Sequence, residues 1–416
     1  MSGIRVNEWL HNSGTGGIWQ TSAGNVGIAS SVPTTKLEIT GDAKISGIST
    51  CAAFAPSQGQ LANKNLIGNG AFNIAQRGTS STTSGFYSVD RFSNYHSGTD
   101  EAPTQAQHAL TSADTGPWEE GFRYSAHITN GNQTSGAGAA DYIMWDTNVE
   151  AIDMATSGWN YTSTTSYVTL SFWVKSSVAQ NFHGYIRTYD GTAMSMPFET
   201  GALTANTWKK VIKNIPGHAN LQFDSNFDKG FKLRIHAYEG TDHTGTVTLD
   251  TWAAYSSSAR TPDDTTTWYT TNDSTFAITG VQLEIGSTAT GFEHRAYGDE
   301  LQKCLRYFWT ITGDNYDKPG ISTFANSAST CRAQVKFPVP MRAAPSFTGS
   351  ATAMMMDAAD DSANFNINTF ALNNVTTEAS PSGCTLEVST SSMTAGQAGD
   401  LEFKANSGFM QFSAEL

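Results

Sequence analysis

The sequence is short of charged residues, and those of negative sign predominate. Among 416 residues, Lys and Arg number 24 and Asp and Glu number 37, so charged residues make up 15% of the chain and its net charge is −13. An ordinary soluble domain has about 25% charged residues. Nucleic-acid binding needs clustered lysine and arginine to neutralise phosphates, and the sequence has no basic block. We therefore expect no nucleic-acid partner.

Long apolar runs are missing as well. No stretch approaches the roughly 18 apolar residues that a membrane-spanning helix needs. The first ten residues, MSGIRVNEWL, contain no apolar signal core. We therefore expect no membrane insertion and synthesis in a cytoplasm without secretion.

Cysteine is scarce, and its spacing is uninformative. The four cysteines lie far apart, without a CxxC pair or a metal-binding spacing, at Cys51, Cys304, Cys331 and Cys384. We expect buried free thiols and no cofactor. A structural calcium ion in an Asp/Asn loop stays open as an alternative, for which the DGT triplet at 190–192 is a weak signal.

What the chain does contain is apolar and aromatic residues set among uncharged polar ones. Hydrophobic residues make up 38% of the chain and aromatic residues 11%, and glycine occurs 38 times. Because apolar content is preserved, the low charge does not indicate disorder. This composition is typical of β-rich, turn-rich extracellular or virion proteins.

Period-two patterns over residues 63–297 predict many strands. Apolar residues alternate in YVTLSFWVKSS, NFHGYIRTYD and FKLRIHAY, and Gly280 shifts the apolar phase within FAITGVQLEIG, which indicates a bulge. Frequent turn residues separate the strands, so we expect an antiparallel β-sandwich or jelly roll. The apolar faces comprise Val168, Leu170, Phe172, Val174, Phe182, Ile186, Phe231, Leu233, Ile235 and Ala237.

The two flanking regions differ from this centre. Residues 1–62 hold two short β-like pieces, NVGIAS and KLEITGDAKISG, that are too short to bury a core alone, followed by a linker. Residues 298–309 have helical periodicity, and β patterns return up to residue 416. We therefore expect an all-β chain in three parts: an N-terminal attachment and shaft segment (1–62), a central jelly roll (63–297), and a short helix with a C-terminal β domain (298–416).

Several motifs resemble those of bacteriophage tail fibres and receptor-binding proteins. NKNLIGNGAFNIAQRGTS followed by YSVDRFSNY is similar to the opening of a domain common in these proteins, and GVQLEIGSTATGFEHRAYGDELQKCLRYF is similar to its ending. VTLSFWVKSS, QVKFPVPMRAAPSF and the final FSAEL also resemble parts of such fibres. NVGIASSVPTTKLEITGDAKISG resembles their shaft unit, although only one clear unit is present.

The resemblance implies a virion protein with a particular arrangement. It implies a homotrimer that is attached by its N-terminus to a tail or baseplate protein and whose distal domains face the host. It also implies a central jelly roll similar to carbohydrate-binding modules. We expect multivalent adhesion to a host surface glycan or receptor, and no enzymatic activity. A purely structural virion protein, such as a capsid decoration or tail adaptor, and a glycan-cleaving tailspike are the alternatives.

The candidate glycan-binding residues lie opposite the apolar faces of three strands. Aromatic rings stack on sugars, and arginine and histidine donate hydrogen bonds to hydroxyl or carboxylate groups. If the strands are neighbours, they form one aromatic and basic surface. Such a face could instead pack on a sister subunit or a neighbouring domain, or be plain solvated surface. These residues are Trp173 and Lys175, then His183, Tyr185, Arg187 and Tyr189, and then Lys232, Arg234, His236 and Tyr238.

Aromatic residues outside the strand patterns are further candidates. They either bind a ligand from loops at one end of the sandwich or cap its core. These are Trp118, Trp145, Trp159, Trp268 and Tyr269. Of this group, Trp268 and Tyr269 join the candidate glycan-binding residues.

Acidic residues show no catalytic arrangement in the sequence. The adjacent acid pairs lie in expected loops, at Glu119-Glu120, Asp263-Asp264 and Asp360-Asp361, and are typical of solvated surface. We expect Glu284, Glu293 and Arg295 to make structural ion pairs or hydrogen bonds near the domain junction. We likewise expect Asp90 and Arg91 to fix the start of the central domain.

Overall fold

The protein is described here by a computed structural model. It describes residues 8–10, 17–28, 32, 37–39, 63–359, 364–372, 379–406 and 408–416. Met1–Ser57 and Gln58–Leu416 form two compact units. Strands make up nearly all of the regular structure, which confirms the all-β expectation. Among the described residues, no helix has the length and apolar character needed to span a bilayer.

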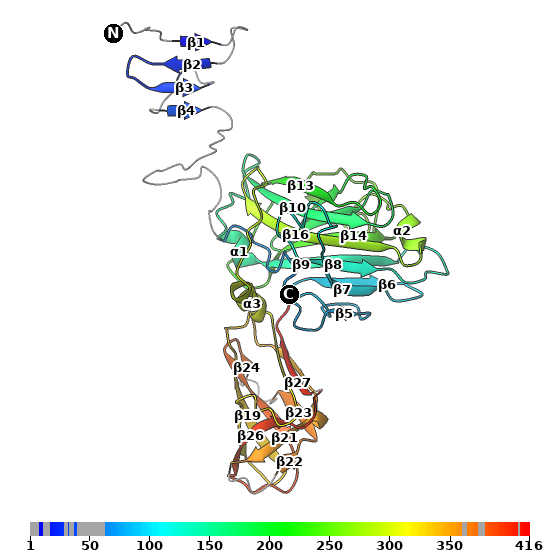
Figure 1. Cartoon of the computed structure of the whole chain (residues 1–416), viewed down its shortest axis with the longest axis vertical. Coiled ribbons are helices and arrows are strands. Elements are labelled where there is room, and N and C mark those ends of the chain that lie inside the picture. Colours follow the sequence, from blue (N-terminus) through cyan, green and yellow to red (C-terminus); the bar gives the residue numbers. More distant parts are fainter. Residues whose placement is uncertain are drawn as a thin grey trace. The chain divides into compact units, whose positions relative to one another are not determined.

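The first unit holds one small sheet of four strands in the order β1-β2-β3-β4 (Figure 1). Its first three strands are antiparallel neighbours, whereas β3 and β4 are parallel. The strands are β1 (Glu8–Leu10), β2 (Gly17–Gln20), β3 (Val26–Ile28) and β4 (Leu37–Ile39). Exposed apolar side chains in this unit are Ile18, Ile28, Val32, Leu37 and Ile39. The expected linker lies largely outside the described residues, as does Cys51.

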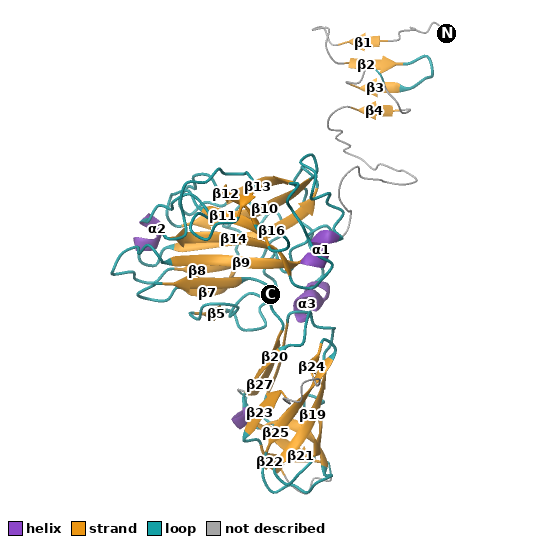
Figure 2. Cartoon of the chain, turned by 180° about the vertical axis from the view of Figure 1, so that it is seen from behind, coloured by secondary structure: helices purple, strands orange, loops and turns teal. Residues whose placement is uncertain are grey.

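The second unit begins with a sandwich of two six-stranded antiparallel sheets, which confirms the expected β-sandwich (Figures 1 and 2). The first sheet has the order β13 (Lys209–Pro216), β10 (Tyr167–Ser176), β16 (Thr275–Ile285), β8 (Tyr124–Thr129), β7 (Thr104–Ala109) and β5 (Ser80–Ser81). The second sheet has the order β15 (Ala253–Ala254), β12 (Met194–Glu199), β11 (His183–Thr188), β14 (Lys229–Glu239), β9 (Tyr142–Glu150) and β6 (Ser93–Ser97). The short helices α1 (Ala151–Ala155) and α2 (Thr267–Thr270) lie at opposite ends of the sandwich.

The core between these sheets is the one that the sequence predicts. All ten residues of the expected apolar faces are buried in a single cluster. The expected bulge is also present, because the pairing of β10 with β16 shifts between Ser171 and Trp173. Gly280 lies within this bulge and has a φ of +64°, a backbone region that favours glycine. Its α-carbon faces the ring of Phe122, where an added Cβ would lie 2.6 Å from the nearest ring carbon.

Helix α3 (Tyr297–Leu305) ends earlier than expected. The periodicity predicts a helix over 298–309, but Phe308 and Trp309 begin strand β17. They pair there with Ser413 and Phe412 of β27. Pairing with a strand about a hundred residues away therefore overrides the local helical pattern.

Two further sheets follow α3. A three-stranded sheet has the order β17 (Phe308–Gly313), β27 (Gly408–Ser413) and β20 (Ser346–Gly349). A larger sheet has the order β22 (Asn364–Asn366), β21 (Met354–Ala358), β26 (Ala398–Phe403), β18 (Ser322–Ala325), β19 (Thr330–Lys336), β25 (Gly383–Ser389) and β23 (Thr369–Leu372), with β24 (Ala379–Ser380) on β25 and the short 3-10 helix η1 (Ala351–Ala353) before β21. Their core includes the buried thiols of Cys331 and Cys384, which, like Cys304, are free as expected.

Candidate functional site

The predicted aromatic and basic surface divides between the two sheets. The expected alternation of side chains between the two faces of each strand is correct. The assumption that all three strands are neighbours is wrong. Strand β10 pairs with β13 and β16 in the first sheet, whereas β11 and β14 pair with each other in the second. Trp173 and Lys175 are therefore separated by the whole core from the candidates on β11 and β14.

Trp173 supports a loop of the first sheet. Its Nε1 donates to Glu120 Oε2 at 3.0 Å, and Lys210 Nζ donates to the same carboxylate at 2.9 Å. Gly116 approaches the ring so closely that an added Cβ would lie 2.6 Å from it. Residues 114–120 thus cover much of the indole, which is half-buried. Trp173 thus packs under a loop of its own domain, which differs from the expected packing on a sister subunit or a neighbouring domain.

On the second sheet, β11 and β14 do bring the candidates together. Tyr185 pairs with Arg234 and Arg187 with Lys232, so these side chains share the outer face. A fifth residue that the sequence argument missed, Asp146 of β9, lies opposite Arg234. Asp146 could not be selected from the sequence, because β9 was not among the expected strands.

Asp146 neutralises two of these cations. Arg234 donates to its two carboxylate oxygens at 2.6 Å each, and Lys232 donates at 2.8 Å. Burial alone would raise the pKa of Asp146, but the charges of Arg234 and Lys232 outweigh burial and hold that pKa well below its ordinary value. Arg234 and Lys232 are therefore structural cations of the outer face.

The loop 240–266 lies against part of the same face. Tyr255 from this loop approaches Tyr185 with a ring-centre distance of 6.3 Å, and Tyr185 is only 1% exposed. The prediction that the ring of Tyr185 is exposed for sugar stacking is therefore wrong. The loop could not be placed on the sheet from its sequence, because period-two patterns describe strands and not what covers them.

Three other candidates are buried in the core. Tyr238 was expected on the outer face, but the register shifts between His236 and Tyr238, and its ring packs 4.5 Å from that of Tyr269. Trp268 and Tyr269 belong to α2 and are fully buried. Trp268 Nε1 donates to the Thr275 carbonyl at 2.9 Å. These corrections favour the alternative in which Trp268 and Tyr269 cap the core. Trp145 and Trp159 are buried too.

His183 and His236 are buried under the same loop. Their rings lie with centres 6.3 Å apart on the outer face. Asp264 of the loop contacts both, with 2.6 Å from its Oδ1 to His183 Nδ1 and 3.5 Å from its Oδ2 to His236 Nε2. Neither histidine is open to a large ligand. In the sequence, Asp264 is half of the adjacent acid pair Asp263-Asp264. This pattern gives no indication of the two histidine partners.

Arg187 and Tyr189 remain accessible at the end of β11. The Arg187 guanidinium lies 4.5 Å from the ring centre of Tyr189 and 3.6 Å from that of Tyr255. All three residues are half-buried. The Arg187 side chain makes no hydrogen bond or ion pair with another residue in the described part of the chain. The guanidinium thus lies close to two tyrosine rings, and its N–H groups, of which Nε is buried, have no hydrogen-bond partner in the described chain.

Lys229 adds a second cation at this end of the sheet. The backbone N–H of Tyr189 donates to the carbonyl of Gly230 at 3.2 Å, which joins the two segments. Burial, together with the positive charges of Lys232, Arg342 and Arg187, lowers the pKa of Lys229 against the opposing effect of Asp146. Within the described ranges no carboxylate pairs with its amine. The carboxylates of Asp190, Asp224 and Asp228 lie near one another at the same end, and Asp228 pairs with Arg342 and not with Lys229.

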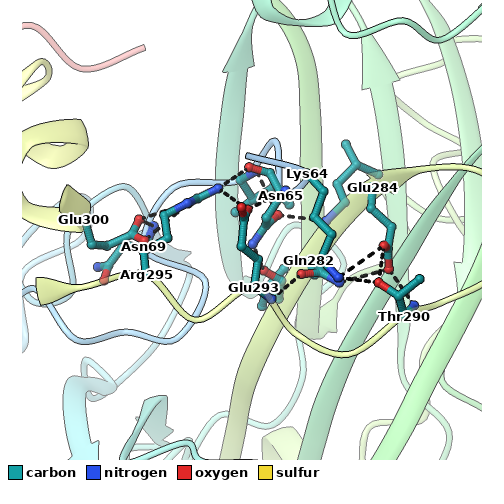
Figure 3. Close-up of polar contacts among 12 residues, drawn as sticks. Lys64, Asn65, Asn69, Gln282, Glu284, Thr290, Glu293, Arg295 and Glu300 are labelled. Carbon is teal, nitrogen blue, oxygen red and sulfur yellow. Dashed lines mark hydrogen bonds and ion pairs between the residues drawn. The ribbon is translucent and has the colours of Figure 1, made fainter. Parts of the chain in front are cut away.

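Glu284, Glu293 and Arg295 make the ion pairs and hydrogen bonds expected of them (Figure 3). Arg295 donates to Glu293 Oε2 at 2.8 Å and to Glu300 Oε2 at 3.2 Å. Glu284 accepts from the backbone and hydroxyl of Thr290 at 2.8 and 2.6 Å. Gln282 connects both groups, because it donates to Glu284 at 2.9 Å and accepts from the backbone N–H of Glu293 at 2.8 Å. Asn65 adds a backbone N–H bond to Glu293 at 2.9 Å.

The adjacent acid pairs have structural partners. Glu120 pairs with Lys210, and Glu119 accepts from the backbone N–H of Gly116. Asp263 accepts from the Thr244 hydroxyl at 2.6 Å. Asp360-Asp361 lies outside the described residues. At the DGT triplet, Asp190 accepts from the backbone N–H of Asp224 at 3.0 Å.

Comparisons with known proteins give weak likenesses. No family model matches the sequence, and no curated protein matches it. A tailspike protein 4 enzymatically active domain of bacteriophage CBA120 is 11% identical, with 53% of this chain and 21% of that chain covered and a TM-score of 0.28. The N-terminal cellulose-binding domain of Cellulomonas fimi β-1,4-glucanase C is 11% identical, with coverages of 52% and 99% and a TM-score of 0.26.

A putative sugar-binding protein of Bacteroides thetaiotaomicron gives similar values. It is 12% identical, with 54% of this chain and 100% of that chain covered and a TM-score of 0.26. The chain spans about a fifth of the tailspike domain but nearly the full length of the two carbohydrate-related structures. These sequence identities and TM-scores are too low to assign a function to this chain. The function must be argued from its own side chains.

Proposed function

We propose that this protein is a phage tail fibre, or a closely related virion appendage, that binds a host surface glycan without cleaving it. The observation that carries the glycan contact is the Arg187 guanidinium held between Tyr189 and Tyr255. Stacking on two rings fixes the guanidinium plane, so that less freedom is lost when it binds a planar acid group. The motifs that resemble phage fibres supply the virion part of the proposal.

Two cations without a carboxylate partner favour an acidic glycan at this site. Arg187 and Lys229 have no carboxylate partner in the described chain, unlike Lys232 and Arg234, which share Asp146. A sugar carboxylate can accept two parallel hydrogen bonds from a guanidinium, whereas a hydroxyl cannot. The rings of Tyr189 and Tyr255 offer apolar surface for the CH groups of the same sugar.

Trimerisation would multiply a weak single-site affinity. The first unit exposes several apolar side chains on short strands, including Leu37, which is 59% exposed. Strands of three or four residues need further packing to be stable, and further copies of the same sheet would supply it. Three linked sites, and several fibres, then raise the effective concentration of binding sites at a cell surface.

The glycan part is tested by a binding comparison. The probes are uronate-containing oligosaccharides, sialylated oligosaccharides and neutral glucose oligomers immobilised on an array. We expect acidic probes to be retained, and Arg187→Ala to lower their affinity at least tenfold. Arg123→Ala is the matched control, because Arg123 also stacks on an aromatic ring, 3.8 Å from Trp118, but on the other sheet. Equal binding of neutral probes, or an unchanged Arg187→Ala variant, would contradict this site.

The virion part needs separate experiments. Immunogold electron microscopy should place the protein on the tail, and purified protein should block host adsorption. Labelling of the capsid without any block would favour the structural alternative. Release of reducing sugar from host polysaccharide would favour the tailspike. Light scattering after size exclusion should give a trimer, and a monomer at micromolar concentration would contradict the shaft.

A further inference from the structure

His183, His236 and Asp264 form a compact donor cluster under the 240–266 loop. One donor atom from each lies within 4.8 Å of the others. The three side chains come from β11, β14 and the loop, and are 8%, 0% and 2% exposed. This cluster lies outside the Arg187 site and has no part in the proposed glycan contact.

The contacts of His236 are not those of an ordinary buried histidine. Its Nδ1 lies 3.0 Å from Glu239 Oε2 and its Nε2 lies 3.5 Å from Asp264 Oδ2. Neither contact has hydrogen-bond geometry, and Glu239 Oε2 is likewise buried without a hydrogen bond among the described residues. Buried polar atoms left in this state are costly, and a missing ligand between His236 Nε2 and Asp264 would account for the unpaired Nε2.

We propose that His183, His236 and Asp264 hold a divalent transition metal ion, for which Zn²⁺ is the best match. Two imidazoles and one carboxylate are a donor set that suits Zn²⁺, whereas Ca²⁺ takes oxygen ligands. Tetrahedral zinc places its ligand atoms about 3.4 Å apart. The donors lie within 4.8 Å of one another, so the widest pair needs to close by up to roughly 1.4 Å around the ion. The hydrogen-bonded pair His183 Nδ1 and Asp264 Oδ1, now 2.6 Å apart, would instead move apart as the ion replaces the proton between them.

Glu239 has the position of a partner that orients a metal-bound histidine. In metal sites the second ring nitrogen of a ligating histidine usually faces a carboxylate, which sets its tautomer and raises its basicity. Glu239 is placed in this way behind His236, and Arg260 in turn donates to Glu239. The backbone N–H of Glu239 also donates to Asp264 Oδ2 at 2.9 Å, which orients the carboxylate.

The ion would attach the 240–266 loop to the second sheet. Asp264 is the loop's contribution, and the two histidines belong to adjacent strands of the sheet. Metal binding to the folded state alone stabilises that state by mass action. We therefore expect EDTA treatment to lower the thermal unfolding midpoint of the full chain and Zn²⁺ to restore it.

The test is metal binding by the metal-free full chain. We expect one Zn²⁺ per chain by calorimetry, and a visible absorption spectrum of tetrahedral Co²⁺ when Co²⁺ replaces it. His183→Gln and His236→Gln should abolish both signals, and Glu239→Gln should weaken zinc binding about 10- to 100-fold. His108→Ala is the control, because His108 and His127 form another close pair, with ring centres 4.8 Å apart, on the first sheet.

The possible outcomes distinguish a metal site at this cluster from its alternatives. The absence of Zn²⁺ and Co²⁺ binding in the wild type would overturn the proposal and leave a His236 proton shared with the two carboxylates. Loss of binding in His108→Ala, with His183→Gln unaffected, would overturn it in favour of the surface pair. If His236→Gln does not fold, the wild-type Co²⁺ spectrum and the His183→Gln variant still decide the question.

Discussion

Arg91 donates from Nη1 to Glu415 Oε2, an ion pair between residues 324 positions apart. The two side chains are 5% and 8% exposed. The same guanidinium donates to the Asn148 carbonyl at 2.8 Å and lies 3.3 Å from the ring centre of Tyr307. Arg91, expected to fix the start of the central domain, therefore joins the sandwich to the segment that follows β27.

Removing the carboxylate of Glu415 should destabilise the second unit strongly. Glu415→Ala leaves the buried Arg91 charge without its partner and also removes a 3.1 Å contact with Arg77. Breaking one side of a buried pair costs about 3–5 kcal/mol. Urea unfolding followed by tryptophan fluorescence measures this loss. Asp242→Ala, at an exposed loop position, is the control and should change the free energy of unfolding by less than about 0.5 kcal/mol.

Asp90 should make the free energy of unfolding change with pH in the mildly acidic range. Burial raises its pKa to about 6, against the opposing effects of Arg77 and of hydrogen bonds from Gln76. Between the unfolded pKa of about 4 and the folded pKa, the folded state holds the extra proton, so the free energy of unfolding falls as pH rises through this window and then levels off. Asp90→Asn should remove this part of the slope in urea unfolding between pH 4 and 7. An identical slope in the variant would show that other groups cause it.

Gly280→Ala should cost more than an alanine at an unhindered glycine. Both the positive φ and the Phe122 ring oppose a Cβ at this position. We expect about 1–2 kcal/mol from the backbone and a further 1–3 kcal/mol from overpacking. Gly158→Ala isolates the backbone cost, since Gly158 has a φ of +87° and no atom within 4 Å of an added Cβ. Equal losses in the two variants would contradict the close packing at the bulge.

Trp268→Ala should act on stability and not on glycan recognition. The fully buried indole caps the sandwich core, and truncation of a buried aromatic side chain costs about 3–5 kcal/mol. Below its unfolding midpoint the variant should bind acidic probes like the wild type. Tyr297→Ala, which removes a 62% exposed ring, serves as the stability control. A selective loss of binding by folded Trp268→Ala would return this residue to the binding site.

The sequence predicts which faces of the strands are buried, because that information is local. The apolar residues that alternate from Val168 to Val174 all lie in the core, although Thr169 and Ser171 between them are buried as well. Strand neighbours are not local information, so nothing in the sequence around Trp173 shows that β10 and β11 belong to different sheets. The register shift before Tyr238 is equally invisible, since it depends on pairing with β9.

The candidate site was predicted in part for the same reason. Arg187 and Tyr189 were selected by alternation along β11, which the structure retains. Tyr255 and Asp264 could not be selected, because they come from a loop whose position depends on contacts with the sheet. Asp146 has the additional difficulty that its role is evident only from its partner Arg234, which lies on another strand.

The hydrogen bonds around Asn65 have a mechanical consequence. The chain enters the sandwich at residues 63–70 and leaves it at residues 281–300, and Asn65, Glu293 and Arg295 connect these two passages directly (Figure 3). A pulling force applied to the chain before residue 63 and after residue 300 would be carried by these short cross-links in parallel. Arg306 and Tyr307 also bond to Glu150, so the remaining load would enter the sandwich at the end of β9.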